Sequence, residues 1–416
     1  MIDLAEARRT LLAACPRIEP VQLASADADG CVLAADVVAP GNVPPFDNSS
    51  VDGYAVRAAD TAGAGPTSPV RFEVLGSVLA GSVADRPVGA GQTWKVMTGA
   101  PVPEGADAVV MVEKSSASRT EQLGAAGDEV SLLAEVSPGA GIRRTGSDVR
   151  AGALVLPAAT VLRPAHLGVL ASVGASRVSG YRRLRVGVLV TGDELVTDGA
   201  PLRPGQIYES NRAMLLALLV RANCEPVDLG QAGDDVAVLA ERLGAAAESC
   251  DAVLTSGGVS MGDSDPVRAV LERFGGLNWL QVAIRPAKPF AFGMLPGPGS
   301  VPVPVLGLPG NPVSALVSFE LLARPALRRM MGHPDPYGLN VLAIADEPLE
   351  RPHGDGRTAY LRVSCQFGPD GRLHVRPVAG QDSHQLSASA AAGGLAQVED
   401  GRRVQAGDEL PVHLLS

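Results

Sequence analysis

Acidic and hydroxyl side chains follow short apolar runs at two points in the chain. One run ends in Thr191-Gly192-Asp193-Glu194, and the other ends at 256–260 and leads to Asp265. A further acid, Asp234, lies between the two. Carboxylates are hard oxygen ligands that suit Mg²⁺, which usually takes one or two of them and completes its shell with water and substrate phosphates. These residues predict a magnesium-dependent site for a small molecule that bears a phosphate.

Two cations and a glycine-containing turn supply the opposite charge. Arg285 and Lys288 precede the turn 307–314, which ends an apolar run directly before a predicted helix. The first N–H groups of a helix have no partner within the helix, so they form a ready site for an anion. Either cluster alone would most often be a set of strand caps. Because both occur at strand ends, we predict a functional site with a second, oxyanion-binding pocket.

A doubly wound α/β domain would position both clusters. Runs rich in valine and leucine at 184–190, 251–255 and 302–308 are typical of buried parallel strands, and 211–223 has the pattern of a helix. In such sheets, ligands bind beyond the carboxyl ends of the strands. The polar turns follow the strands at those ends, so we expect them along one edge of the sheet.

The remainder of the chain indicates further domains, so the predicted fold class is α/β plus β. Short β-type runs separated by glycine and proline over 70–136 indicate a small β domain, and a second β region begins at His333. We predict four domains, with these boundaries: a discontinuous N-terminal domain (1–45 and 143–180), an inserted β domain (46–142), the α/β domain (181–332) and a C-terminal β domain (333–416).

Three polar positions in the first half of the chain could serve a site. Asp52 lies in the loop 43–56, Thr98 follows a predicted strand, and Asp148 follows the adjacent arginines Arg143 and Arg144. Taken singly, an acid in such a loop or a pair of arginines is most often part of a solvated surface.

Composition excludes several classes of protein. The 416 residues are 46% hydrophobic and carry a net charge of −10, which argues against a general nucleic-acid binder. No run approaches the roughly 18 apolar residues of a membrane span, and the N-terminus lacks the pattern of a signal peptide. The five cysteines form no C-x-x-C pair, and the six histidines lack the spacing of zinc ligands. We expect a cytoplasmic protein without a membrane partner.

Five motifs carry a resemblance to a known family. They are PFDNSSVDGYA (45–55), MTGAP (97–101), TGDEL (191–195), SGGVS (256–260) and GLPGNPVS (307–314). In this order they resemble the molybdopterin molybdenumtransferases, the MoeA family, which includes the E domain of gephyrin. The resemblance covers essentially the whole chain.

The resemblance implies an elongated homodimer of four-domain chains, with a pterin-binding α/β domain and a C-terminal β-barrel. It also implies a reaction in which adenylylated molybdopterin and molybdate give molybdenum cofactor and AMP, with Mg²⁺ required. The sulfur ligands of the molybdenum come from the dithiolene of the substrate. Molybdopterin adenylyltransferase is a candidate partner that would deliver this substrate.

The resemblance also implies roles for individual residues. The implied catalytic residues are Asp52, Thr98, Asp148, Glu194, Asp234 and Asp265. Glu194 and Asp265 are expected nearest to the metal, and in the family Asp52 and Thr98 act across the dimer interface. The implied molybdate pocket contains Arg285, Lys288, Pro289, Ser314, Arg362 and Ser383. The implied substrate contacts are Thr191, Gly192, Ser256, Gly257, Gly258, Ser260, Pro309 and Pro312.

Three departures from the family pattern leave alternatives open. The usual Lys-Pro-Gly-Lys-Pro is RPAKP (285–289), Gln281 stands in place of a lysine, and Val51 stands in place of a methionine. Arginine differs from lysine in charge geometry, and alanine restricts the backbone more than glycine does. The altered pocket motivates a non-catalytic pterin-binding scaffold as an alternative, and a pterin- or nucleotide-processing hydrolase is a third. The preference between molybdate and tungstate stays open.

Overall fold

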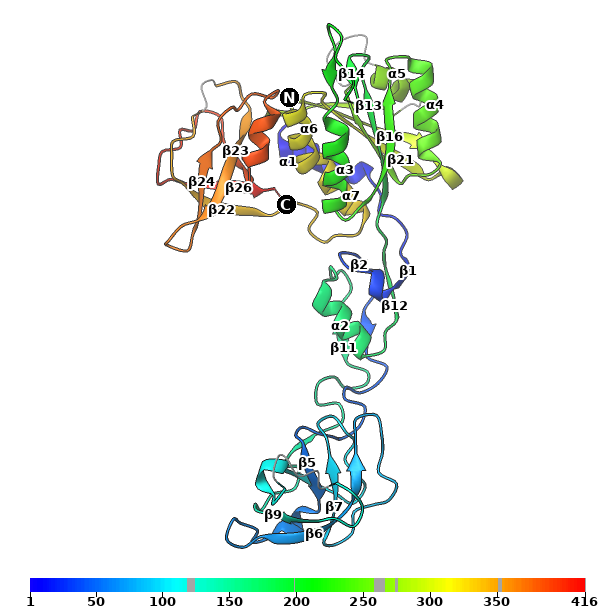
Figure 1. Cartoon of the computed structure of the whole chain (residues 1–416). Helices are drawn as coiled ribbons and strands as arrows, with labels where there is room; N and C mark the ends of the chain where they lie inside the picture. Colours follow the sequence, from blue (N-terminus) through cyan, green and yellow to red (C-terminus); the bar gives the residue numbers. More distant parts are fainter. Residues whose placement is uncertain (118–123, 198, 258–265, 274–275, 351–353, 416) are drawn as a thin grey trace. The chain divides into compact units, whose positions relative to one another are not determined.

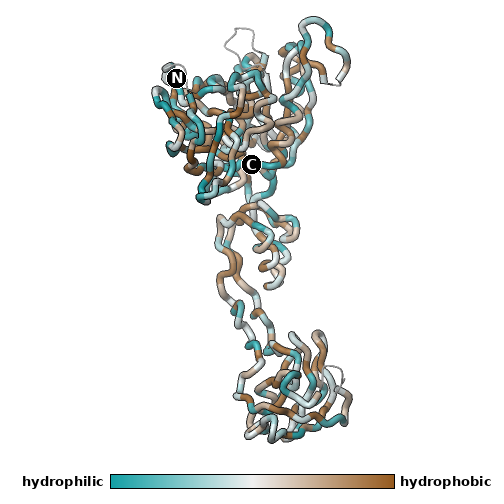
Figure 2. Tube along the Cα trace, turned by 60° about the vertical axis from the view of Figure 1, so that its left-hand side comes forward, coloured by the Kyte–Doolittle hydropathy of each residue, from teal (hydrophilic) through white to brown (hydrophobic). Residues whose placement is uncertain are grey.

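The computed structural model describes residues 1–117, 124–197, 199–257, 266–273, 276–350 and 354–415 (Figure 1). The chain forms two compact units. The first contains Met1–Gln22, Gly30–Ala34 and Ser179–Ser416, and the second contains Leu23–Asp29 and Ala35–Val178. Both units contain hydrophobic stretches (Figure 2), so each can build a core of its own. The segments that pass between the units contain β1 (Val21–Ala24), β2 (Val32–Leu33) and β12 (Arg177–Tyr181).

A mixed six-stranded sheet forms the centre of the first unit. Its strands, in spatial order, are β16 (Glu225–Ala232), β13 (Arg185–Thr191), β17 (Ala252–Ser256), β21 (Pro302–Leu308), β20 (Pro289–Pro296) and β18 (Asn278–Gln281). The first four run parallel, whereas β20 runs antiparallel to both of its neighbours. The parallel strands predicted from the apolar runs are therefore confirmed, and the two added strands make the sheet mixed.

Helices cover both faces of this sheet, because successive side chains of a strand point to opposite faces. The helices are α1 (Leu4–Ala14), α3 (Asn211–Arg221), α4 (Val236–Ala247), α5 (Pro266–Arg273), α6 (Pro312–Ser318) and α7 (Arg324–Met330). Val188 and Leu254 belong to a core shared with α1, α3, α6 and α7, whereas Leu189 and Val253 belong to a core shared with α4 and α5. In Figure 1, α4 and α5 lie on the opposite side of the sheet from α3 and α6.

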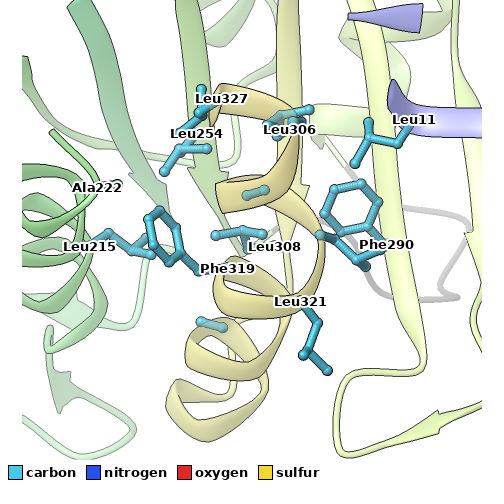
Figure 3. Close-up of a cluster of buried hydrophobic side chains, with 14 of the residues drawn as sticks. Leu11, Leu215, Ala222, Leu254, Phe290, Leu306, Leu308, Phe319, Leu321 and Leu327 are labelled. Carbon is cyan, nitrogen blue, oxygen red and sulfur yellow. The ribbon is translucent and has the colours of Figure 1, made fainter. Parts of the chain in front are cut away.

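The first helix packs in the core of the α/β unit. The carboxylate of Asp3 caps it by accepting a hydrogen bond from the Glu6 N–H at 2.7 Å. Leu11 is fully buried and points toward Phe290 of β20 (Figure 3). We predicted that residues 1–45 form one domain with residues 143–180. The apolar side chains of α1 instead pack against α7 and β20. The predicted domain boundaries as a whole stay a prediction.

A π-helical turn, Phe319–Ala323, joins α6 to α7. The sequence analysis predicted a helix directly after the turn 307–314 and gave no sign of this π-helical turn. Phe319 points from it toward Leu215 of α3 (Figure 3), and both side chains are fully buried. The turn is therefore packed on the same core as the helices on either side of it.

The C-terminal part of the first unit is a closed five-stranded barrel. Its strands are β22 (Asn340–Ala345), β23 (Thr358–Phe367), β24 (Leu373–Pro377), β25 (Gly394–Val398) and β26 (Glu409–Leu414). They pair in the order β23-β24-β22-β26-β25, and β25 pairs back with β23, which closes the ring. The predicted C-terminal β-barrel is confirmed. A short strand, β19 (Ile284–Arg285), pairs with β23 and joins the barrel to the loop of Arg285.

The second unit is built on a five-stranded sheet. In spatial order its strands are β8 (Ala108–Met111), β5 (Gly53–Val56), β7 (Gln92–Val96), β6 (Val70–Val78) and β9 (Glu129–Leu132). The outgoing strands β3 (Val37–Val38) and β4 (Asn48–Ser49) pair with the returning strands β11 (Leu154–Leu156) and β10 (Ile142–Arg143), and α2 (Pro164–Ser172) follows. The chain thus leaves and returns side by side, which confirms an inserted β domain.

A short ribbon lies beside the end of the central sheet. A two-stranded ribbon, β14 (Leu195–Val196) and β15 (Ile207–Tyr208), follows the end of β13. Among the described residues, the longest apolar helices are still too short to cross a membrane.

Candidate active site

The four parallel strands end level with one another at one edge of the sheet. Thr191 is paired with Ala232, Val190 with Ser256, and Ser256 with Leu308. A Cβ atom on Gly257, whose φ is +91°, would lie 2.6 Å from the carbonyl oxygen of Thr191. Only glycine fits this position, so the two turns approach each other closely.

This edge brings together the described members of the predicted substrate-binding set, which are Thr191, Gly192, Ser256, Gly257, Pro309 and Pro312. Gly258, Ser260 and Asp265 lie outside the described residues. Gly257 donates its N–H to the carbonyl of Leu308 at 3.2 Å, and so joins the end of β17 to the end of β21.

An asparagine that the sequence analysis missed ties two of these turns together. The Asn211 Nδ2 group donates to Ser256 Oγ at 2.8 Å and to the carbonyl oxygen of Gly310 at 2.7 Å. Asn211 Oδ1 and Thr191 Oγ1 are buried and have no hydrogen-bond partner among the described residues. Buried polar atoms without a partner cost about 1–3 kcal/mol each. Such atoms call for a partner such as a water molecule or a ligand, which is consistent with a binding site at this edge.

Three carboxylates gather at the ends of β13 and β16. Asp193 Oδ1 accepts a hydrogen bond from the Asp234 N–H at 3.4 Å. The carboxylate of Glu194 lies over Gly192, because a Cβ atom there would be 2.6 Å from Glu194 Oε2. Partial burial, followed by the negative charges of Asp193 and Glu194, raises the pKa of Asp234. The charges repel one another, and a divalent cation would relieve that repulsion.

The donor set of this edge fits Mg²⁺. Among the described residues, no three His, Cys, Asp or Glu side chains converge closely enough to hold a metal ion by themselves. Mg²⁺ does not require such a cage, since it commonly binds one or two carboxylates together with water and substrate phosphates. Glu194 and Asp234 are exposed and can supply those carboxylates.

The cations lie at the same edge of the sheet. Because β20 runs antiparallel to β21, with Ala291 paired to Gly307, its first residue Pro289 lies where the parallel strands end. The side chains of Arg285 and Lys288, which precede it, have no hydrogen-bond or ion-pair partner among the described residues. Ala287 between them has a φ of +76°. The backbone therefore takes the left-handed conformation that the family's glycine would allow, although alanine is present.

The loop 380–389 of the barrel region contacts the start of α6. Asn311 Nδ2 donates to Ser383 Oγ at 3.3 Å, and the Val313 N–H donates to the carbonyl of Ser383 at 3.2 Å. Ser314, one residue further on, is buried. Ser314 and Ser383, both predicted for the molybdate pocket, are therefore close to each other.

Arg362 holds this loop from inside. It is 1% exposed, and its guanidinium donates to four acceptors, the carbonyls of Gly380, Asp382 and Gln385 and the hydroxyl of Ser389. Burial lowers the pKa of Arg362, and the negative charge of Asp382 opposes that shift. These contacts support a positioning role for Arg362; contact of its side chain with an oxyanion stays a prediction.

In the second unit, the carboxylate of Asp52 is already hydrogen-bonded. The Thr98 N–H and hydroxyl donate to Asp52 Oδ1 at 2.7 and 2.8 Å, and these bonds, with the charge of Lys95, lower the pKa of Asp52. Asp148 is exposed, and its N–H donates to the carbonyl of Val43 at 3.0 Å. The structure thus pairs Asp52 with Thr98.

Other polar residues at these sites escaped the sequence analysis. Asp47 accepts from Arg144 Nη1 at 2.6 Å and from the Thr145 N–H at 2.7 Å. Gln231 Nε2 donates to the carbonyl of Gly192 at 2.8 Å and so braces the TGDEL turn. Asp47 lies within the motif PFDNSSVDGYA (45–55), so its place in that motif could have identified it from the sequence. Gln231 and Asn211 lie at the end of a strand and the start of a helix, where amides usually serve as local caps.

Comparison with known proteins extends over nearly the whole chain. The family models described as the MoeA N-terminal region (domain I and II), a probable molybdopterin binding domain and the MoeA C-terminal region (domain IV) match residues 2–174, 187–329 and 348–415. Molybdopterin molybdenumtransferase 2 of Mycobacterium tuberculosis is 39% identical over 99% of both chains. The molybdopterin molybdenumtransferase of Haemophilus influenzae is 38% identical over 93% of this chain and 92% of its own.

A solved structure agrees with these matches. The molybdopterin biosynthesis MoeA protein from Pyrococcus horikosii superposes with a TM-score of 0.78 at 30% identity, and the match covers 100% of this chain and 99% of that chain. The likeness therefore includes both compact units and the barrel, and the chain belongs to the MoeA family of molybdopterin molybdenumtransferases.

Proposed function

We propose that the protein inserts molybdate into the dithiolene of adenylylated molybdopterin, and that it releases AMP and molybdenum cofactor. One observation supports this most strongly. Acids without a cation (Asp193, Glu194, Asp234) and cations without an acid (Arg285, Lys288) occur at one edge of the same sheet, as far as the described residues go. A substrate with a phosphate and an oxyanion, accompanied by Mg²⁺, supplies the missing partner of each.

The strand ends would hold the pterin part of the substrate. Thr191, Ser256 and Pro309 come from three neighbouring strands, and Gly257 lets the backbone approach without a side chain in the way. Thr191 is 5% exposed, and its hydroxyl oxygen is buried without a hydrogen-bond partner among the described residues. A pterin ring offers both donors and acceptors along its edge, so it matches a site with hydroxyl and carbonyl groups.

Glu194 and Asp234, together with Asp265, would hold Mg²⁺ when it is bound. The ion would neutralise the phosphoanhydride of the adenylylated substrate and the charge that develops on the leaving AMP. Asp193 orients Asp234 through the 3.4 Å bond to its N–H, and Gln231 braces the turn that carries Glu194.

Arg285 and Lys288 would bind molybdate, with Pro289, Ser314 and Ser383 shaping the pocket. Ala287 keeps the left-handed φ of +76°, so its substitution for glycine leaves the loop between the two cations in a glycine-like conformation. This favours a functioning oxyanion pocket over a scaffold with a damaged one. Gln281 still removes one positive charge, so we propose a weaker affinity for the anion than a lysine there would give.

The second unit would complete the site in a homodimer. Asp52, Thr98 and Asp148 are proposed to act at the α/β edge of the partner protomer, with Asp52 kept as a carboxylate by Thr98. The substrate is proposed to arrive from a molybdopterin adenylyltransferase. Analytical ultracentrifugation of the full chain tests the dimer.

AMP release from adenylylated molybdopterin, titrated separately with molybdate and tungstate in the presence of Mg²⁺, tests the function. We expect release that saturates at micromolar molybdate, a common scale for KM. Substrate binding without oxyanion-dependent release would support the scaffold alternative. Release that needs no oxyanion would support the hydrolase.

A further inference from the structure

The turn 309–311 is held from two sides by two different parts of the site. On one side, the carbonyl of Gly310 accepts a hydrogen bond from Asn211 Nδ2 at 2.7 Å. On the other side, the side chain of Asn311 donates to Ser383 Oγ at 3.3 Å. The first contact lies with the proposed pterin-binding strand ends, and the second lies with the proposed molybdate pocket.

The carboxamide of Asn211 is fixed in one orientation. The Gly310 carbonyl can only accept, so the amide nitrogen and not the oxygen must face it. The same nitrogen donates to Ser256 Oγ at 2.8 Å, and that hydroxyl lies 3.4 Å from the carbonyl of Pro309, to which it donates. Asn211 is 7% exposed, so water does not readily replace these bonds.

The helix behind Asn211 is anchored. Asn211 begins α3, whose Leu215 and Leu219 are fully buried in the core shared with α6 and α7. The amide therefore connects a rigid element to both Ser256 and the turn. Its removal would free the turn without moving the helix.

On its other side, the turn 309–311 is followed by a second contact with the loop of Ser383. The Val313 N–H donates to the carbonyl of Ser383 at 3.2 Å, and Arg362 holds the loop of Ser383 through three carbonyls and a hydroxyl. A shift of residues 309–311 would therefore break the register between Asn311 and Ser383, because that loop cannot follow freely.

We propose that Asn211 is a positioning residue that couples the two halves of the site, so that the pterin-binding strand ends and the molybdate pocket keep one relative arrangement. This rests on the proposed function for its kinetic consequences. Asn211 itself is not assigned a contact with the reacting atoms.

The kinetic test uses Asn211→Asp, which keeps the size of the side chain but loses both donors. We expect KM to rise about tenfold for both adenylylated molybdopterin and molybdate, with kcat less affected, since the loss of about one or two hydrogen bonds misplaces both subsites. Protonation of the new carboxyl restores one donor, so both KM values should recover in part as pH falls toward its raised pKa. The wild type should show no such recovery.

Two further variants complete the series. Asn211→Ser keeps one donor and should give an intermediate rise, and it serves where Asn211→Asp does not fold. Asn340→Asp is the matched control, since Asn340 Nδ2 also donates to a backbone carbonyl, that of Gly338 at 3.1 Å, but lies in the barrel. We expect the control to leave both KM values unchanged. A rise in the KM for the pterin substrate alone, or in neither, would overturn the proposal.

Hydrogen exchange measured by mass spectrometry gives a reading that does not depend on turnover. In the substrate-free full chain, Asn211→Asp should speed amide exchange about tenfold in peptides covering both 310–316 and 380–389, and Asn340→Asp should not. Faster exchange in 310–316 alone would overturn the coupling. If the wild type releases no AMP, the proposed function fails, and this exchange experiment still decides whether the two segments are coupled through Asn211.

Discussion

Asp52 and Asp234 are both implied in catalysis, yet the two compact units treat them in opposite ways. In the second unit, the N–H and hydroxyl of Thr98 both donate to Asp52 and lower its pKa. In the first unit, burial and the charges of Asp193 and Glu194 raise the pKa of Asp234. The second unit therefore supplies its acid with partners from its own chain, whereas no positive charge among the described residues lowers the pKa of Asp234 in the first unit.

The difference extends to the neighbouring charges. Asp47 in the second unit forms an ion pair with Arg144 at 2.6 Å. At the α/β edge, Arg285 and Lys288 have no acidic partner among the described residues, and the nearby acids have no basic one. These charges are accessible to solvent, so a ligand can reach them. Asp47 and Asp52 are thus preorganised by their own chain, whereas the charges at the α/β edge are available to bind a ligand.

The largest expected effect comes from removing an acid at the α/β edge. Glu194→Ala should lower Mg²⁺-dependent AMP release by about a hundredfold, because it removes a proposed ligand of the Mg²⁺ that would neutralise the leaving phosphate. The fold should persist, since an exposed acid at a strand end contributes little to the core. Release measured at saturating substrate, with circular dichroism to check folding, tests this.

Glu241→Ala is the matched control for Glu194→Ala. Glu241 is exposed on α4, away from the strand ends. It should keep wild-type release. If Glu194→Ala also kept it, Glu194 would not be a metal-binding residue, and the acidic cluster would be merely structural.

A smaller effect is expected when the preorganised acid loses its charge. Asp52→Asn retains an oxygen that can accept from Thr98, so the free energy of unfolding should fall by at most about 1 kcal/mol at pH 7, because the site is exposed. The folded pKa lies below the unfolded value of about 3.9. The stabilisation is therefore present above that value and is lost as pH falls through the folded pKa.

Urea denaturation at pH 7 and near pH 3 measures this effect. The difference between wild type and Asp52→Asn should shrink at the lower pH. Asp85→Asn, at an exposed acid of the same unit, should differ little from wild type at either pH. A stabilising Asp52→Asn would contradict the assignment of Asp52 as a preorganised carboxylate.

The sequence predicted the strand ends well because each is a local pattern. The valine-rich run before TGDEL and the run before SGGVS became β13 and β17, and the helix predicted over 211–223 became α3. The contacts that make the site are not local. Asn211 reaches Gly310 across 99 positions, and Thr98 reaches Asp52 across 46. No periodicity encodes such pairs, so Asn211 and Gln231 were missed.

Two other features show why the sequence fell short. The domain prediction placed residues 1–45 with 143–180, whereas Ala7 and Leu11 of α1 pack in the core of the α/β unit. The resemblance implied that Arg362 belongs to the molybdate pocket, but it did not indicate that the guanidinium donates to four acceptors on one loop. A residue type indicates what a side chain can bind, and only the packing determines which group it does bind.

A still smaller effect, with the opposite sign, is expected at Asp234. A raised pKa means that the carboxylate destabilises the folded chain above its folded pKa, and that this penalty disappears below the unfolded value. Asp234→Asn should therefore stabilise the metal-free protein at pH 7, by no more than about 0.5 kcal/mol for an exposed group. Near pH 3 the gain should vanish.

When Mg²⁺ is added, we expect the wild type to become more stable than Asp234→Asn. Ion binding stabilises the wild type by mass action, and Asp234→Asn should respond less. The midpoint of thermal unfolding, measured with and without Mg²⁺ for both proteins, decides the point. If Asp234→Asn were less stable than wild type without metal, the acid would already have a partner, and the contrast with Asp52 would fail.

The smallest expected effect concerns a histidine of the barrel that resembles Asp52 in having its own partners. Hydrogen bonds from His374 Nδ1 to Asp346 at 2.6 Å and from Nε2 to Asp370 at 3.1 Å raise the pKa of His374. Its stabilisation is thus fully present below the unfolded pKa of about 6.5 and is lost as pH rises through the folded pKa. His374→Gln should flatten the dependence of the unfolding midpoint on pH between about 6 and 8. An unchanged slope would mean that Arg376, which pairs with Asp346 at 2.9 Å, satisfies that acid alone and leaves the histidine uncoupled.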